Sequence, residues 1–345
     1  MSLQSEIFEQ PAILRRLLKN SLGIIQDIAR EIDSRDISYV FLAARGTSDN
    51  AGLYAKYVWG AFNQLPIALA APSLFTLYER PPDLRNSLVV GISQSGESPD
   101  IVRVVEEGRR QGAPTMTITN EPTSPLAQNA DYVISLGSGT EEAVAATKTY
   151  TAQLLAIAMF SVALRADRER LRHLESLPRW VDQALGQDQM IASLVESYRD
   201  MQQCVVIGRG YNYSTAFEWA LKLKELAYVM ASPFSSADFQ HGPSALLTEG
   251  YPVFAVAPHG AGTTLMIDFL GQLVSERRVD LLAISNDENL LTQAHAPIVL
   301  PADVPEWLTP IVSIVSAQLV SYHLARAKGL DTENPRGLQK VTRTW

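Results

Sequence analysis

The stretch SLVVGISQSGESPDIVRVVEEGRRQG, residues 87–112, passes from a strand-like apolar run into helical spacing through the loop SQSGESPD at 93–100. A buried strand that turns directly into a helix is the repeating step of a parallel α/β sheet. The alternation therefore predicts βαβ units, with a parallel sheet covered by helices on both faces. Other strand-like runs and helical intervals lie at 39–44, 51–62, 100–111, 115–119 and 131–136.

The pattern then returns at a nearly constant offset. VFLAARG ending at Gly46 is matched by VVIGRG ending at Gly210, 164 residues later. The other matches are LVVGIS with VFAVA (ending at 93 and 257), TITN with AISN (120 and 286) and DYVISL with HAPIVL (131–136 and 295–300). Four matches in the same order predict two copies of one α/β unit.

This duplication predicts the domain organisation. A helical segment over 1–35 precedes a first domain at 36–165, and a second domain follows at 200–330. The linker between them, 166–199, has helical spacing with few breakers until Pro178. The tail, 331–345, is polar and contains proline and glycine, which by itself suggests a frayed end.

Composition limits the classes of function. With 46% hydrophobic and 19% charged residues, the chain of 345 residues reads as a soluble globular protein with a sizeable core. Its net charge of -8 argues against a general affinity for nucleic acid or acidic membranes. The first twenty residues do not resemble a signal peptide, and no apolar run approaches the ~18 residues of a membrane span. We therefore expect a cytoplasmic location.

Cysteine and histidine give no sign of a metal centre. Cys204 is the only cysteine, so neither an intrachain disulfide nor a cysteine cluster can form, and its place in QCVVIG predicts a packed, inert thiol. The five histidines show no metal-ligand spacing. We expect no metal and no cofactor.

The loop SQSGESPD has the parts of a phosphate-binding site. It is expected at the carboxyl edge of the sheet, where open α/β folds bind ligands, and the helix from Pro99 presents unpaired N–H groups to an anion. Gly96 lets the backbone approach closely. Capping of that helix by Ser98 is the alternative, but it explains one serine of three. The hydroxyl and amide donors are Ser93, Gln94, Ser95 and Ser98.

A second turn, ARGTSDN at 44–50, follows the first strand of the same unit. Thr47 and Ser48 are placed to reach the same anion, although an ordinary capped turn is the alternative. In the second copy, PHGAGT at 258–263 takes the place of the serine loop and has lost its serines. Only the first copy is therefore expected to bind phosphate.

Two features of the second copy carry titratable groups. In TAFEWALKLKELAYVM, Glu218, Lys222 and Glu225 fall on one helix face. From spacing alone this pattern favours a solvated stripe with a weak Glu-to-Lys pair. His241 lies in a Gln-His-Gly-Pro loop, and a lone loop histidine is usually just exposed.

Together the motifs resemble the sugar isomerase (SIS) domains, and in particular the tandem pair that forms the isomerase half of glucosamine-6-phosphate synthase and its stand-alone relatives. The resemblance implies two tandem SIS domains, each a flavodoxin-like three-layer αβα unit, in a protein that works as a homodimer on a sugar phosphate. It covers almost the whole chain, through EIFEQP 6–11, RGTSDNAG 45–52, SQSGESPD 93–100, GTEEAVAATKTYTAQL 139–154, ALKLKE 220–225, QHGP 240–243 and NPRGLQK 334–340.

The resemblance also implies roles for individual residues. Glu225 would shuttle the proton with Lys222 beside it, and His241, contributed across the dimer interface, would open the sugar ring. Lys340 would form a Schiff base with a ketose carbonyl, which would make the tail a folded lid. The implied phosphate-binding residues are Ser48, Ser93, Gln94, Ser95 and Ser98, with further substrate contacts at Gly46, Thr47, Val144 and Ala145.

Two departures from the synthase direct the functional hypothesis. Arg45 stands where the synthase commonly has a cysteine, and the amino-terminal cysteine nucleophile that supplies ammonia from glutamine is missing. The favoured reaction is therefore conversion of glucosamine 6-phosphate to fructose 6-phosphate and ammonia. A fructosamine-6-phosphate deglycase and an isomerase that retains nitrogen are close alternatives. A sugar-phosphate sensor is the alternative from another class, although the first 36 residues are too short and too mixed in charge for a DNA-binding segment.

Overall fold

The computed structural model describes residues 2–340 and divides the chain into two compact units. The β1 unit comprises residues 9–142, 148–176 and 339–340 of the described chain, and the β6 unit comprises 2–8, 143–147 and 177–338. Each unit contains one five-stranded parallel sheet. The predicted fold class, two parallel sheets flanked by helices, is confirmed.

The sheet of the β1 unit has the order β2-β1-β3-β4-β5. Its central strand, β3, is buried along its whole length, which is why SLVVGIS reads as a continuous apolar run. The strands are β1 (Tyr39–Ala43), β2 (Ile67–Leu69), β3 (Ser87–Ser93), β4 (Thr115–Thr119) and β5 (Tyr132–Ser135).

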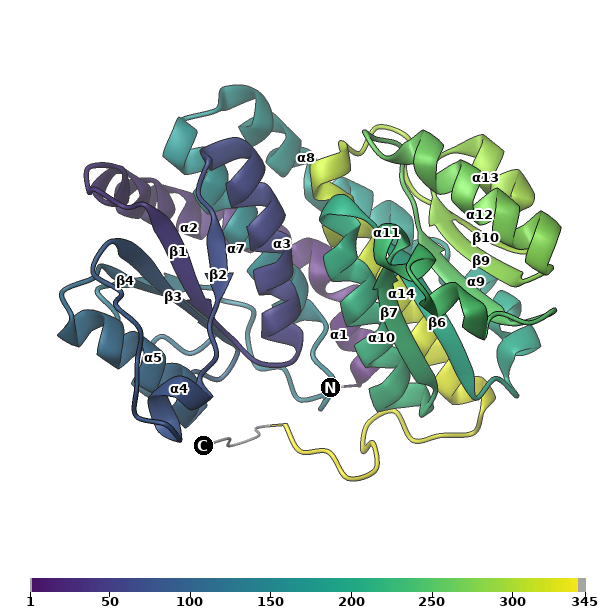
Figure 1. Ribbon diagram of the computed structural model, residues 1–345, viewed down its shortest axis with the longest axis horizontal. Coiled ribbons are helices and arrows are strands. Elements are labelled where there is room, and N and C mark those ends of the chain that lie inside the picture. The colour runs from purple at the N-terminus through teal and green to yellow at the C-terminus, as the bar shows by residue number, and fades with distance from the viewer. Residues whose placement is uncertain (1, 341–345) are drawn as a thin grey trace. The chain divides into compact units, whose positions relative to one another are not determined.

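Helices cover both faces of this sheet (Figure 1). On one face, Val104 and Val105 of α5 pack with Phe41 and Val89 of the sheet. On the other, the rings of Trp59 and Phe160 pack 5.2 Å apart between α3 and α7. The first face carries α4 (Ser73–Thr76), α5 (Pro99–Arg110) and α6 (Pro125–Gln128), and the second carries α2 (Gln10–Asp33), α3 (Thr47–Asn63) and α7 (Lys148–Arg165).

The sheet of the β6 unit has the order β10-β9-β8-β6-β7. Counted from its own first strand, this is the same 2-1-3-4-5 order, the flavodoxin-like arrangement. The four sequence matches fall on β1 and β6, β3 and β8, β4 and β9, and β5 and β10, so the predicted duplication is confirmed. The strands are β6 (Gln203–Gly208), β7 (Met230–Ser235), β8 (Pro252–Val256), β9 (Asp280–Ser285) and β10 (Ala296–Val299).

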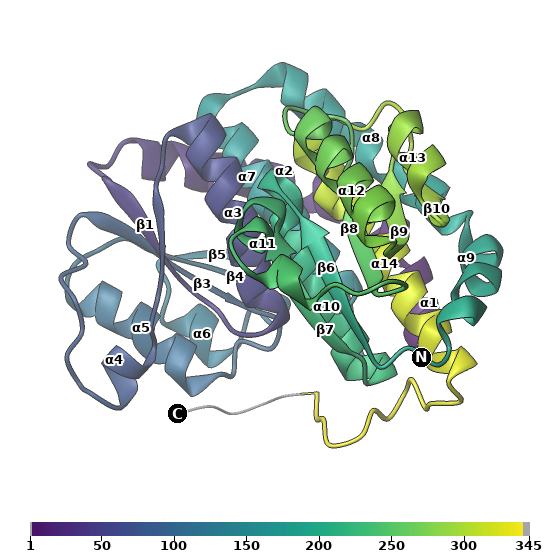
Figure 2. The ribbon, with the colours of Figure 1, turned by 45° about the vertical axis from the view of Figure 1, so that its right-hand side comes forward.

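Helices also cover both faces of the second sheet (Figure 2). One face packs against α11 (Ser236–Gln240), α12 (Thr263–Arg277) and α13 (Glu288–Gln293). The other packs against α10 (Tyr213–Ala227), where the rings of Trp219 and Phe254 stack 5.1 Å apart. The remaining helices of the unit are α1 (Leu3–Phe8) and α9 (Asp188–Leu194), both of which contact α14 (Thr309–Ala327).

Two helices differ from the sequence expectations. Glu306–Ala327 is long and apolar enough to cross a membrane by length and composition, although no such run was expected. Because 94% of its most apolar window is buried within the protein, it fits a core helix. The helix α8 (Arg168–Leu185) continues through Pro178, where the helical pattern was expected to break.

Cys204 lies in β6 and is completely buried. Burial raises the pKa of its thiol to about 12, against a smaller opposing effect of Lys224. A thiol of this kind is almost never a thiolate at neutral pH, so the structure agrees with the packed, inert cysteine predicted from its strand.

Candidate active site

The two predicted phosphate-binding turns lie at one edge of the first sheet. Strands β1 and β3 are neighbours, yet the helices that follow them cover opposite faces, and such a switch point is where open α/β sheets bind ligands. The first turn, 44–50, follows β1, and the serine loop, residues 93–100, begins at the last residue of β3. Arg45 joins them, because its Nε donates to Asp100 Oδ2 at 2.8 Å.

The backbone of the serine loop requires glycine at position 96. Gly96 has a φ of 64°, in the left-handed region. A Cβ at this position would lie 2.0 Å from Ser124 Oγ, so the loop also packs too closely for any side chain. The Gly96 N–H donates to Ser93 Oγ at 3.1 Å, and the Gly96 carbonyl accepts from Leu126 N at 3.1 Å. Both backbone polar groups of Gly96 are thus hydrogen-bonded, which fixes the loop at this residue.

The hydroxyl groups of the loop are arranged to donate. Ser93 Oγ accepts from Gly96 N–H and Ser95 Oγ accepts from Glu97 N–H, at 3.1 and 3.3 Å, which leaves the hydroxyl hydrogen of each serine for another acceptor. Ser98 occupies the N-cap position of α5 but accepts no capping hydrogen bond from that helix. The alternative that Ser98 is a helix cap is therefore wrong, and its hydroxyl also remains for a ligand.

The first turn has the same character. Ser48 is buried in the first turn of α3, and its Oγ accepts from Gln153 Nε2 of α7 at 2.9 Å, so its hydroxyl hydrogen points elsewhere. Gly46 precedes α3 with a φ of 53°, and Thr47 is the first helical residue. Val144 and Ala145 belong to the β6 unit, and their contact with substrate stays a prediction.

A cavity of about 730 Å³ opens at the carboxyl ends of β3, β4 and β5. Gln94 and Ser95 of the serine loop line it, and so does Lys340 from the far end of the chain. The structure therefore brings the predicted Schiff-base lysine and two predicted phosphate-binding residues to one cavity. Residues 341–345 of the predicted lid lie outside the described residues.

The predicted acid–base residues lie in α10 of the β6 unit. Lys222 is completely buried, and its Nζ lies 2.5 Å from Glu225 Oε2 and 3.3 Å from Glu218 Oε1. The side chain of Glu218 is completely buried too, whereas that of Glu225 is 22% exposed. The solvated stripe favoured from spacing alone is therefore wrong.

Charge around Lys222 fixes its protonation. Burial alone would lower the pKa of Lys222, but the attraction of Glu218 and Glu225 outweighs it and raises that pKa above its ordinary value. Lys222 therefore remains an ammonium over the whole physiological range. Glu225, the more exposed carboxylate, is the member of the cluster that a ligand can reach.

Comparison with known proteins agrees with this architecture. Residues 35–163 and 197–327 each match the SIS domain family. The chain belongs to the SIS domain family. Its two SIS domains contain the two parallel sheets described above, β1–β5 in the first and β6–β10 in the second.

Relatives of this SIS protein are similar along nearly all of its length. Glutamine–fructose-6-phosphate aminotransferase (isomerizing) of Aquifex aeolicus is 33% identical over 338 residues, covering 97% of this chain but 56% of the relative. The chain thus spans about half the length of the curated relatives it matches. The C-terminal domain of glucosamine-fructose-6-phosphate aminotransferase from Francisella tularensis is 30% identical, with a TM-score of 0.88 over 96% of this chain and 98% of its own.

The structure of a glucosamine-6-phosphate deaminase from Thermotoga maritima has a similar fold. The two structures align over 100% of both chains with a TM-score of 0.78. At 18% sequence identity, this likeness shows a shared fold and nothing further.

His241 lies in the second SIS domain, just after α11. Its side chain is exposed, and the next residue, Gly242, has a φ of 129° that favours glycine. The Gln-His-Gly-Pro loop therefore has a defined turn with an accessible histidine at its start. The structure holds one chain, so a contribution of His241 to a partner's site stays a prediction.

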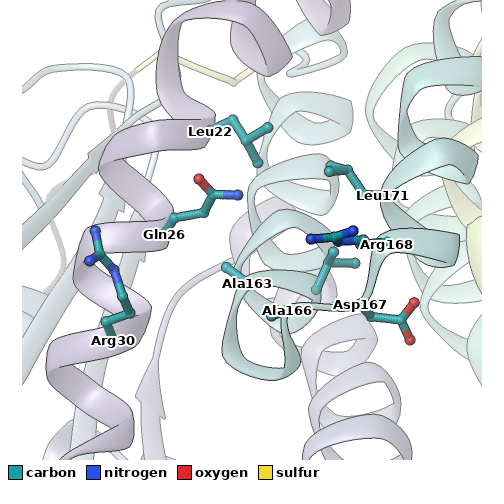
Figure 3. A pocket seen from close by; sticks show the side chains of 9 residues that line it. Leu22, Gln26, Arg30, Ala163, Ala166, Asp167, Arg168 and Leu171 are labelled. Carbon is teal, nitrogen blue, oxygen red and sulfur yellow. The ribbon is translucent and has the colours of Figure 1, made fainter.

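A second cavity, of about 330 Å³, lies between α2, α7 and the start of α8. Figure 3 shows Gln26 and Arg168 facing each other across it, while Asp167 points away. None of the predicted site residues lines this cavity.

Within residues 2–340, no group of three or more His, Cys, Asp or Glu side chains is arranged to hold a metal ion.

Proposed function

We propose that this SIS protein is a phosphosugar aldose–ketose isomerase that releases ammonia from glucosamine 6-phosphate and so forms fructose 6-phosphate. The observation that carries the proposal is the charged cluster of α10, in which Glu218 and Lys222 are completely buried and Glu225 is 22% exposed. Placing two charges out of water costs several kcal/mol unless each is compensated, and binding of a neutral sugar ring does not require them. A reaction that transfers protons requires charged groups of this kind, so the cluster favours an enzyme over a sensor.

The serine loop and the first turn serve as the phosphate site in this proposal. Their serines direct hydroxyl hydrogens outward, and α5 adds the positive end of its dipole. A dianion held by neutral donors at a helix N-terminus is a common arrangement for sugar phosphates. Anchoring the phosphate fixes the orientation of C1 and C2, which reduces the entropic part of the barrier.

Glu225 acts as the general base in the proton transfer between C1 and C2. Lys222, always charged, stabilises the negative charge that develops on the C1 oxygen of the enolamine intermediate. The roles are complementary, because an ammonium whose pKa is raised cannot take up the substrate proton, whereas a carboxylate can. His241, contributed by a second copy in a homodimer, opens the sugar ring, and Lys340 forms the Schiff base with the ketose.

Release of ammonia follows from the isomerisation. Moving the C1–C2 proton converts the aldosamine into a ketose imine, and water adds to that carbon while ammonia leaves, so no oxidant or reductant is needed. The isomerising aminotransferases support the isomerase step by sequence.

The proposal is tested by ammonia release from glucosamine 6-phosphate, coupled to detection of fructose 6-phosphate. Galactosamine 6-phosphate and a fructosamine 6-phosphate run in parallel. The Glu225→Gln variant should lose about 10²–10⁴-fold in kcat, as expected for loss of a general base. Glu249→Gln, an exposed glutamate of the same unit, is the matched control and should keep full activity.

Each other outcome points away from the deaminase. Turnover of the fructosamine 6-phosphate alone would identify a deglycase. Interconversion of hexose phosphates without ammonia would identify an isomerase that retains nitrogen. Binding of all three compounds without turnover would identify a sensor and contradict the proposed function.

A further inference from the structure

Lys340 makes a defined ion pair inside the first cavity. Its Nζ donates to Glu141 Oε2 at 2.7 Å, the side chain of Glu141 is completely buried, and that of Lys340 is 24% exposed. The two members of the pair differ in exposure, because the carboxylate is buried and the ammonium is partly accessible to solvent. Both side chains line the cavity, and Lys340 is the more exposed of the two.

The carboxylate of Glu141 is held in place by the start of α7. The Thr149 N–H donates to Oε1 at 3.1 Å, and Thr149 Oγ1 donates to Oε2 at 2.8 Å. Thr149 is in the first turn of α7, whose dipole favours a negative charge at that end. The Glu141 carboxylate is thus held by two hydrogen bonds from Thr149, and it accepts a third from Lys340.

The cavity joins this pair to the phosphate site. Gln94 and Ser95 line it together with Glu141 and Lys340. The other charged side chains on its wall are Arg16, Glu97 and Glu121. A ketose phosphate bound at the serine loop would therefore meet the Lys340 amine in the position that Glu141 gives it.

We propose that Glu141 is the positioning residue for Lys340 and exchanges its proton during Schiff-base formation. This inference rests on the proposed function. An ammonium has no electron pair, so Lys340 first transfers one proton to Glu141, and the freed pair on Nζ forms the bond to the ketose carbon. A second proton moves from nitrogen to the former carbonyl oxygen. Glu141 returns its proton to that oxygen, the C–O bond breaks and water leaves, so ammonium plus ketone becomes iminium plus water.

The test is reductive trapping. Borohydride delivers hydride to the iminium carbon and fixes the sugar on Lys340, where peptide mass spectrometry finds it without any need for turnover. In Glu141→Gln, the amide can still accept from Thr149, but it no longer attracts or deprotonates the ammonium. We expect the yield of fructose 6-phosphate adduct to fall at least about tenfold, while the dissociation constant for fructose 6-phosphate changes less than about threefold.

Glu249→Gln is the matched control. It makes the same substitution at an exposed glutamate that does not line the cavity, so its adduct yield should stay near that of the wild type. Lys340→Ala should give no adduct at that peptide. A kcat that falls in Glu141→Gln with an unchanged KM would agree with the trapping result.

Three results would overturn the inference. These are an unchanged adduct yield in Glu141→Gln, an equal loss in Glu249→Gln, and a wild-type protein that isomerises sugar phosphates without ever forming an adduct on Lys340. The last would leave the isomerase standing and remove only the Schiff base. A wild type that neither binds nor converts any phosphosugar would instead overturn the proposed function.

Discussion

Replacing Gly96 with alanine tests whether the shape of the serine loop determines phosphate binding. The new Cβ would lie 2.0 Å from Ser124 Oγ and 2.5 Å from Ser124 Cβ, far inside normal contact distances. Holding an L residue in the left-handed region costs about 1–2 kcal/mol, and overpacking of a tight site about 1–3 kcal/mol. We therefore expect the free energy of unfolding to fall by about 2–5 kcal/mol in total.

The same change should weaken ligand binding, because the loop can relieve the overlap only by moving away from Ser124. Such a movement displaces the hydroxyls of Ser93 and Ser95. A shift of about 1 Å in groups that position a substrate can lower the catalytic rate about a hundredfold, which shows how sensitive such sites are to small displacements. We expect the dissociation constant for glucosamine 6-phosphate, measured by calorimetry, to rise at least about tenfold.

A double variant separates the two contributions. Adding Ser124→Gly removes the atoms that the new Cβ meets, so the double variant should regain most of the affinity and retain only the strain of the left-handed backbone. Ser124→Gly alone is the control, because Ser124 also caps α6 through Ala127 N. Unchanged affinity in folded Gly96→Ala protein, or no recovery in the double variant, would refute the reasoning.

Two further changes address the charged groups. Lys222→Met leaves two carboxylates close together, one of them completely buried, and should lower the free energy of unfolding by about 3–5 kcal/mol in urea denaturation at pH 8. In the wild type the raised pKa of Lys222 keeps its stabilising charge in place from pH 5 to pH 8, since that contribution is lost only as the pH rises through the folded-state pKa. Arg45→Ala removes the guanidinium that pairs with the completely buried Asp100 carboxylate and should lower the free energy of unfolding by about 1–3 kcal/mol. Phosphosugar affinity should also fall, because the two turns are no longer joined; equal affinity by calorimetry would show that Arg45 has no part in the site.

Much of the fold could be predicted from the sequence because buried parallel strands form continuous apolar runs. Four strands of each sheet were found in this way. The fifth strand of each was not. β2 has three residues at a sheet edge, and β7 contains Pro233, which an edge strand tolerates because that residue needs no ladder N–H.

The candidate site was predictable where a loop has unusual chemistry and unpredictable where burial decides. Three serines in one turn stand out in a sequence, whereas Glu218, Lys222 and Glu225 have the spacing of an ordinary exposed helix face. Only the packing around α10 shows that Lys222 is enclosed. Glu141 was not singled out either, although an acid in GTEE close before a long helix was a signal for an interaction with that helix start.

The β6 unit, as a compact folded unit, does not coincide with the second repeat of the sequence. The repeat begins near residue 36, yet the β6 unit includes α1, whose Leu3 and Ile7 are completely buried. Glu6 of α1 accepts from Ala143 N at 3.2 Å, and the Leu3 N–H donates to Glu333 at the other end of the chain. A fragment that starts at residue 177 would contain every strand of the second sheet and still lack two pieces of its own interior. The second repeat alone is therefore not a complete folding unit, because segments from outside it complete its core.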